Sequence, residues 1–190
     1  GFAYWAAQAT MWRGWTLTAQ GQHAEGIAQI LQGLTARHAT GASLYRASHL
    51  ALLAEAYRKA GQVEEGLRVM AEALVSADTT GERLYEAELH RLKGELLLQQ
   101  VPPDAPQAER CFQQALAIAR GQQAQSLELR AAVSLSCLWE QQGRLPTAHK
   151  MLAEVYSGFT EGFNTVDLWE AQAWLDITMG EREAWGDLSQ

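Results

Sequence analysis

The passage GWTLTAQGQHAEGIAQILQGL, from Gly14 to Leu34, recurs in altered form three more times along the chain. The other copies are AEAYRKAGQVEEGLRVMAEAL from Ala54, GELLLQQ followed after a break by PQAERCFQQAL from Gly94, and SCLWEQQGRLPTAHKMLAEVY from Ser136. Successive copies begin 40, 40 and 42 residues apart. Self-similarity at a period of roughly 20–50 residues is typical of repeat proteins, so these copies decide the fold.

Small and large residues alternate in the same order in every copy. Two helices joined by a turn approach closely only where side chains are small, and bulky neighbours then fill the gaps. The small positions are Gly14, Ala54, Gly94 and Ser136, then Gly26, Gly66, Ala108 and Ala148, then Gly33, Ala73, Ala115 and Val155. The large positions are Leu17, Tyr57, Leu97 and Trp139, then Ile30, Met70, Phe112 and Leu152. The alternation therefore predicts packed helix pairs.

A turn glycine separates the two helices of three copies. Gly21, Gly61 and Gly143 supply the positive φ that ends a helix, and the third copy has prolines in their place. Pro106 and Pro146 are predicted in first helical turns, where a missing N–H costs nothing. The predicted helices are 3–19, 23–38, 44–60, 63–78, 82–100, 105–121, 124–142, 145–157 and 166–179.

This code of small and large residues resembles the tetratricopeptide (TPR) pattern over about 150 of the 190 residues. The resemblance implies an all-α fold, a right-handed superhelical stack of antiparallel helix pairs that forms an α-solenoid. The period is longer than the 34 residues of a standard TPR. Each first helix is expected to begin a turn early, with an apolar residue at Trp5, Tyr45, Tyr85, Leu127 and Trp169.

The longer unit resembles the helical-repeat regions of large bacterial signalling proteins such as MalT-like transcription activators. LALLAEAYRKAGQVEEGL from Leu50 and TGERLYEAELHRLKGELLLQ from Thr80 are similar to the C-terminal region of cyclase-type and regulator-type proteins that also carry an ATPase module. The resemblance implies a piece of a multidomain regulator. It does not make this chain catalytic.

The expected domain organisation is a single repeat domain over residues 1–179. Its units span about 3–38, 44–78, 82–121 and 124–157, with a final helix at 166–179 and a C-terminal tail at 180–190. The chain begins with Gly1 and not with methionine, so we expect it to be part of a longer protein.

Composition disfavours several classes of partner. The net charge is −7, and the lysines and arginines are scattered, whereas nucleic-acid binding needs a clustered basic face. No apolar run is long enough to span a membrane. Two cysteines, Cys111 and Cys137, without a CxxC motif indicate no disulfide scaffold. We therefore expect a cytoplasmic protein that binds neither nucleic acid nor membrane.

No catalytic, cofactor or metal motif is found in the sequence. GQHAEG from Gly21 has the GxxxxG spacing of a phosphate loop but is followed by Ile27-Ala28, not by Lys and Ser/Thr. The five histidines form no HExxH motif and no i,i+4 pair, which disfavours a zinc site. We expect most of them to be polar or half-buried helix residues, and Trp12, Trp139, Trp169 and Trp174 to belong to the core.

The first helices of TPR pairs line a concave groove, which locates the candidate binding residues. They are Trp15, Glu55, Arg58, Glu88, Arg91, Glu95, Arg130 and Glu140. The Lys/Asn/Arg positions that clamp a C-terminal carboxylate in some TPR modules hold Met11, Trp15, Ala51, Glu55, Arg91 and Glu95 here, so that clamp is absent. The charged residues form either a solvated face or a groove that receives a peptide or domain.

Three functions remain open at this stage. The first is a protein–protein interaction scaffold that engages a partner or another domain of the same protein. The second is a small-molecule sensor that controls oligomerisation of a regulator, which needs an enclosed pocket with converging polar groups. The third, an enzyme, has no supporting motif.

An apolar stripe at the start of the chain predicts self-association. Phe2, Trp5, Ala9 and Trp12 recur every three to four residues and so share one helical face. Because an uncapped repeat exposes an interface, we expect this chain to self-associate through this face or to hide it by folding Phe2 back. In a longer protein an upstream helix pair is expected to cover it.

Overall fold

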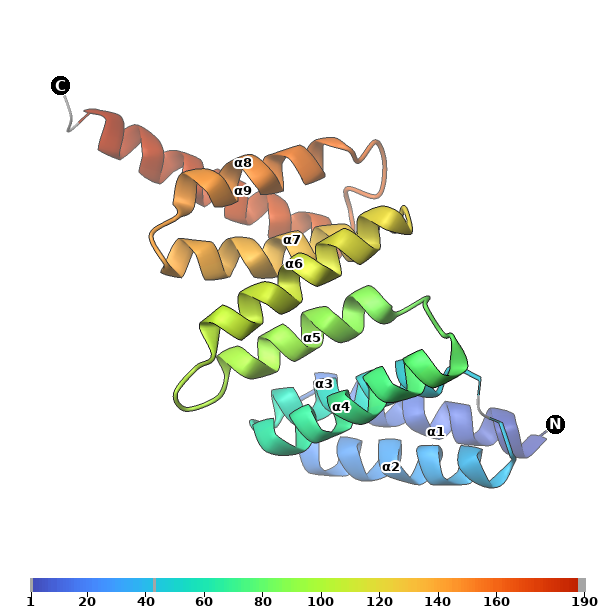
Figure 1. The fold of residues 1–190 in the computed structure, drawn as a ribbon. Helices are drawn as coiled ribbons and strands as arrows, with labels where there is room; N and C mark the ends of the chain where they lie inside the picture. Colours follow the sequence, from blue (N-terminus) through green and yellow to red (C-terminus); the bar gives the residue numbers. More distant parts are fainter. Residues whose placement is uncertain (1, 43, 188–190) are drawn as a thin grey trace. The chain divides into compact units, whose positions relative to one another are not determined.

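Helices form all the regular structure in the part of the chain that the computed structural model describes, residues 2–42 and 44–187. Within these residues no strand occurs, and the prediction of an all-helical fold is confirmed. The helices are α1 (Phe2–Ala19), α2 (His23–Ala39), α3 (Arg46–Lys59), α4 (Val63–Thr80), α5 (Glu86–Leu98), α6 (Ala105–Gly121), α7 (Gln125–Gln141), α8 (Leu145–Ser157) and α9 (Val166–Asp187) (Figure 1).

Most helix bounds agree with the sequence prediction. The bounds of α6 and α8 match it at both ends, with Pro106 and Pro146 in their first turns. The early start predicted for two helices is wrong, because α3 and α5 begin after Tyr45 and Tyr85. Gly41 and Gly81, both with positive φ, lie at the ends of the preceding helices, and the chain needs several further residues to reverse direction.

The last helix is longer than the predicted 166–179. It continues to Asp187, into the segment predicted as a C-terminal tail, and residues 188–190 of that segment lie outside the described residues. No proline interrupts this stretch, and its Glu, Arg and Ala residues favour helix.

The chain divides into two compact units, residues 1–108 and 109–190, with the boundary inside α6. In the first unit α1 pairs with α2 and α3 with α4, each pair antiparallel, and α5 packs against both α3 and α4 (Figure 1). In the second unit α7 pairs with α8, and α9 packs against both. These are the helix pairs that the repeat predicted within each unit.

Glycines set the close approach of α1 and α2. A Cβ atom added to Gly14 would lie 2.6 Å from the carbonyl oxygen of Gly26, and one added to Gly33 would lie 2.8 Å from that of Ala7. Neither distance is tolerable for a real side chain, so backbone meets backbone at these positions. Gly66 of α4 is also tightly packed, since an added Cβ would lie 2.6 Å from Cδ2 of Leu96 on α5. At other small positions Ala54, Ser136 and Ala148 are fully buried.

The turn glycines have the predicted conformation. Gly61 has a φ of 71°, and Gly21 and Gly143 have φ values of 84° and 74°. After Gly61 the N–H of Gln62 donates to the carbonyl oxygen of Tyr57 at 2.9 Å, which closes the end of α3. A non-glycine residue here would be held in the left-handed region at a steric cost.

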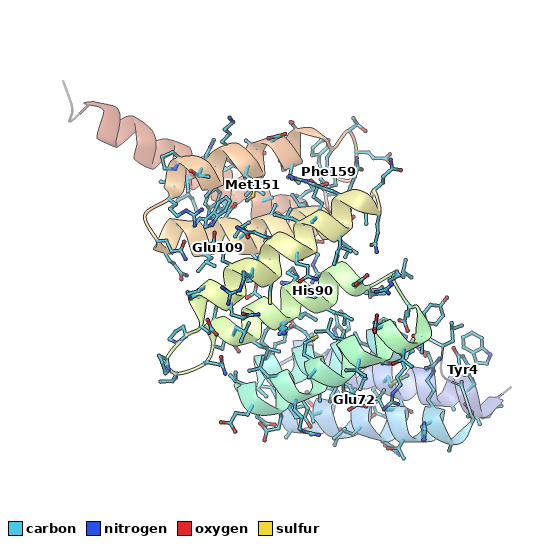
Figure 2. The ribbon with its side chains drawn as sticks, in the orientation of Figure 1. Tyr4, Glu72, His90, Glu109, Met151 and Phe159 are labelled. Atoms are coloured by element: carbon cyan, nitrogen blue, oxygen red, sulfur yellow. The ribbon has the colours of Figure 1, made fainter. Side chains whose placement is uncertain are left out.

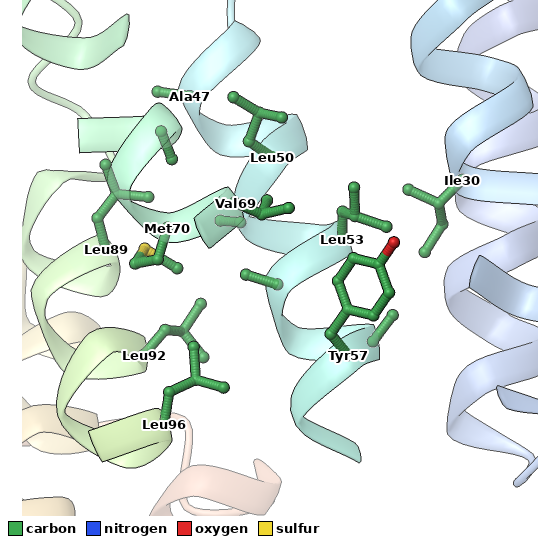
Figure 3. Close-up of a cluster of buried hydrophobic side chains, with 14 of the residues drawn as sticks. Ile30, Ala47, Leu50, Leu53, Tyr57, Val69, Met70, Leu89, Leu92 and Leu96 are labelled. Carbon is green, nitrogen blue, oxygen red and sulfur yellow. The ribbon is translucent and has the colours of Figure 1, made fainter. Parts of the chain in front are cut away.

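The large repeat positions form the core. Ile30, Met70, Phe112 and Leu152 have no exposed surface. Figure 3 shows part of the first unit's core, where Met70 of α4 lies beside Leu89 and Leu92 of α5. Ridges from neighbouring helices thus interdigitate as the repeat code predicts.

The tryptophans are only partly in the core. Trp139 is buried as predicted, but Trp12 and Trp169 are exposed, so for these two the prediction is wrong. Helical spacing places a residue on a face of its own helix, and whether another helix covers that face depends on the tertiary structure.

In the described part of the chain, no helix is both long and apolar enough to cross a membrane.

Candidate binding surface

Charged side chains of α3 and α5 form one network in the first unit. Glu55 and Arg58 of α3 are joined by two hydrogen bonds, from Arg58 Nε at 2.7 Å and from Nη2 at 2.9 Å. Lys59 Nζ lies 3.8 Å from the same carboxylate. Because the Arg–Glu pair is bidentate, it is held in a defined geometry.

The α5 part of the network centres on Arg91. Its Nε and Nη2 donate to the two carboxylate oxygens of Glu88 at 2.9 and 2.8 Å, and its Nη1 donates to Glu95 at 3.3 Å. Both Arg91 and Glu88 are buried, whereas Glu95 is partly exposed. We call Glu55, Arg58, Glu88, Arg91 and Glu95 the mixed-charge face.

Charged groups on α3 and α5 shift each other's pKa values across the mixed-charge face. Burial alone would lower the pKa of Arg91, but the hydrogen bond to Glu88 and the charges of Glu88, Glu95 and Glu55 raise it. Burial likewise would raise the pKa of Glu55, but Arg58 and the charge of Arg91 hold it below its usual value. The two helices therefore stabilise each other's charges.

The remaining candidate residues of the sequence analysis lie elsewhere. Trp15 lies on α1, where its ring packs edge-on against Trp12 at 6.0 Å between centroids. Arg130 and Glu140 belong to α7 in the second unit, and Glu140 accepts a 2.8 Å hydrogen bond from Trp174 Nε1 of α9. Five of the eight predicted residues thus lie on α3 and α5, where they pair within each helix and influence one another across the two helices by their charges. The described contacts do not join Trp15 to them.

Two clusters of polar side chains were not predicted. In the second unit Glu109, labelled in Figure 2, accepts hydrogen bonds from Trp139 Nε1 and Arg144 Nη1, both at 2.8 Å. Burial would raise the pKa of Glu109, but the hydrogen bonds from Arg144 and Trp139 lower it. The Arg144 guanidinium also lies 4.4 Å from the centre of the Trp139 ring. These partners are about 30 residues apart, so no local spacing signals them.

The second cluster surrounds Arg37, which is buried at the end of α2. Its Nη1 lies 3.2 Å from Nδ1 of His49, and its Nη2 donates to the carbonyl oxygen of Leu44 and, at 3.4 Å, to the hydroxyl of Tyr4. The Tyr4 ring centre is 5.1 Å from the guanidinium carbon of Arg37. Burial, and then the charge of Arg37, lower the pKa of His49 to about 4. His49, expected to be polar or half-buried, is in fact buried.

Solved structures with the same fold are TPR-like repeats. One is a single-substitution variant of the nearly identical TPR-like repeats of a proposed kinesin light chain from Podosopora anserina, with a TM-score of 0.71 and 16% identity, covering 99% of this chain and 92% of that one. The unsubstituted repeats have a TM-score of 0.69 and 17% identity, covering 95% and 90%. No family model and no curated protein matches the sequence. The chain therefore has a TPR-like helical-repeat fold.

Proposed function

We propose that this chain is a protein–protein interaction module that binds a peptide or domain partner through the mixed-charge face. The observation that supports this proposal is the charged network of α3 and α5, on a fold that generally mediates protein interaction. Arg58, Glu55 and Glu95 remain partly accessible, whereas Arg91 and Glu88 are buried, and Arg91 donates a hydrogen bond to Glu95. A partner with alternating charges would complement such a face.

A charge reversal on the accessible residues tests this proposal. The double variant Arg58→Glu, Glu95→Arg keeps the total charge but inverts the pattern, and Arg13→Glu on exposed α1 serves as the control. Affinity capture with each protein, followed by calorimetry with the purified partner, measures the effect. We expect the inverted variant alone to lose the partner, with a dissociation constant raised at least about tenfold. Equal binding by all three proteins would contradict the proposal.

A small-molecule sensor that controls oligomerisation is the second candidate. The hollows found in the first unit are open grooves and not enclosed pockets, which favours a macromolecular partner over a small molecule.

The sequence resemblance to MalT-like regulators and to proteins with cyclase or ATPase modules supports a further proposal, that the chain belongs to a cytoplasmic bacterial signalling protein. In such a signalling protein the repeat domain would bind the partner and connect it to the cyclase or ATPase module.

We also propose that the chain itself has no catalytic activity and binds no nucleotide. The support is that neither GQHAEG from Gly21 nor GQVEEG from Gly61, which have the GxxxxG spacing, is followed by Lys and Ser/Thr. Calorimetric titration with ATP is expected to show no binding. A dissociation constant below about 100 µM, roughly 5.5 kcal/mol of binding, would overturn this part of the proposal.

Self-association through the first helix completes the proposed function. Phe2 is 90% exposed, Trp5 68% and Trp12 48%, and the three lie on α1 at helical spacing. We expect the chain to dimerise through them in light scattering, and Trp5→Glu, Trp12→Glu to remain monomeric. Trp169→Glu on α9, equally exposed, is the matched control. A wild-type monomer at high concentration would show that this face is inert.

A further inference from the structure

A hollow of about 300 Å³ lies between α2, α3 and α4, within the first unit. Leu50, Leu53 and Tyr57 of α3 line it together with Val69 of α4, and all four are buried. Figure 3 shows Leu53 and Tyr57 projecting from α3 towards α2, with Val69 beside them. We call this hollow the α2–α4 groove. Its floor is apolar, and its volume suits a few side chains of a docked segment.

Basic side chains border the groove. Arg46, Arg68 and His38 line it, and Glu72 is the one carboxylate in its described lining. Arg46 pairs with Glu72, so these two charges cancel. Arg68 is exposed, and among the described residues no carboxylate pairs with it. The groove therefore keeps a positive edge on a chain whose net charge is −7.

The next repeat does not preserve this combination. Forty residues further on, the positions of Leu50 and Leu53 hold His90 and Lys93, and those of His38 and Arg46 hold Asp78 and Glu86. Helix packing imposes the same requirement on every repeat, which is why the small and large positions recur. Leu50, Leu53, Tyr57 and Val69 belong to the buried core of the first unit, so helix packing accounts for the apolar floor, but it does not require the basic edge.

We propose that the α2–α4 groove binds an acidic amphipathic segment of a partner protein. One or two apolar side chains of the segment rest on Leu50, Leu53 and Val69, and a carboxylate pairs with Arg68. Apolar anchors supply the affinity and the charge pair fixes orientation and selects against basic segments. This groove shares no residue with the mixed-charge face, so it is a second binding surface that is independent of the first.

A pair of synthetic helical peptides tests the proposal on the full chain. The probe is a fluorescein-labelled peptide of about twelve residues with Leu along one face and Glu elsewhere, and its counterpart carries Lys in place of Glu. Fluorescence polarisation measures affinity, and methyl NMR of the full chain locates the site. We expect the acidic peptide to bind and to shift the methyl signals of Leu50, Leu53 and Val69.

Surface variants make the test specific. Arg68→Glu and Leu31→Glu, at the groove edge, are each expected to weaken the acidic peptide at least about tenfold. Leu31 is 41% exposed, so its substitution leaves the core intact, and the melting temperature verifies this. Arg13→Glu on α1 is expected to change nothing. Unchanged binding by Arg68→Glu, equal binding of the basic peptide, or no binding up to about 1 mM would each overturn the proposal.

Discussion

Arg37 and Arg91 are both buried in the first unit, 3% and 8% exposed, but different groups surround their charges. Arg91 lies between two carboxylates, those of Glu88 and Glu95. Arg37 meets an imidazole nitrogen, a carbonyl oxygen and a phenol, and in the described contacts no carboxylate reaches it. A buried cation needs compensation. Dipoles supply it for Arg37, whose buried Nε has no hydrogen-bond partner among the described residues, whereas charges supply it for Arg91.

The difference has a consequence for pH dependence. The carboxylates of Glu88 and Glu95 compensate the charge of Arg91. Arg37 instead needs His49 to stay neutral, since a protonated imidazole can no longer accept its hydrogen bond and would repel it. The Arg37 cluster is therefore the acid-sensitive one of the two.

The largest expected effect comes from removing a carboxylate beside Arg91. Glu88→Gln keeps the shape but leaves a buried cation with weaker compensation, and we expect the free energy of unfolding to fall by about 3 kcal/mol. Urea denaturation followed by circular dichroism measures this change. The control is Glu64→Gln on the exposed surface of α4, with no effect expected. A loss below about 1 kcal/mol would mean that Glu95 alone suffices for Arg91.

Acid is expected to destabilise the protein through His49. The folded-state pKa is lowered to about 4, so below the ordinary value of 6.5 the unfolded chain takes up a proton that the folded chain does not. The free energy of unfolding should therefore fall as pH falls, by about 2 kcal/mol between about pH 7 and about pH 5.

The variant His49→Asn isolates this contribution. Its amide oxygen can accept the hydrogen bond from Arg37 without titrating, so the acid-induced loss should shrink by about 2 kcal/mol. His90, whose pKa burial also lowers, is present in both proteins and cancels in the comparison. Identical pH profiles of the two proteins would show that His49 is not the acid-sensitive group.

A smaller effect is expected where the same kind of ion pair is more exposed. Arg58 and Glu55 keep 23% and 19% of their side-chain surface, so solvent screens their pairing. Arg58→Met should lower the free energy of unfolding by about 1 kcal/mol, well below the effect at Arg91. Chemical denaturation at low and high salt checks this, since a screened pair loses its contribution in salt. A loss as large as that for Glu88→Gln would mean that burial does not set the difference.

The smallest effect is expected at Tyr4. Its hydroxyl accepts a long hydrogen bond of 3.4 Å from Arg37, and its ring stays in place in Tyr4→Phe. We expect a loss of about 0.5 kcal/mol, because the contact between guanidinium and ring is kept. Thermal unfolding beside the exposed-site control Tyr85→Phe measures it. A larger loss would show that Arg37 depends on the phenol as much as on His49.

Features that recur between copies could be predicted from the sequence. The turn glycines, the buried small positions such as Ala108 and the bounds of α6 and α8 follow from local spacing that recurs. The exposure of Trp12 and Trp169 could not be predicted, because helical spacing says nothing about whether a neighbour covers a face. For the candidate surface, helical spacing predicted the i,i+3 and i,i+4 pairs of Arg91 with Glu88 and Glu95, but not that Arg91 and Glu88 are buried.

The sequence by itself determined the helical-repeat fold of this chain. A helix, a turn and a small-to-large packing code depend on residues close together in the chain, and four copies reinforce one another. Only the tertiary structure decided which polar groups meet, such as Arg37 with His49 and Glu109 with Trp139. These pairs lie 12 and 30 residues apart and form only once neighbouring helices are packed. The same packing decided that Leu50 and Leu53 line an open groove beside Arg68.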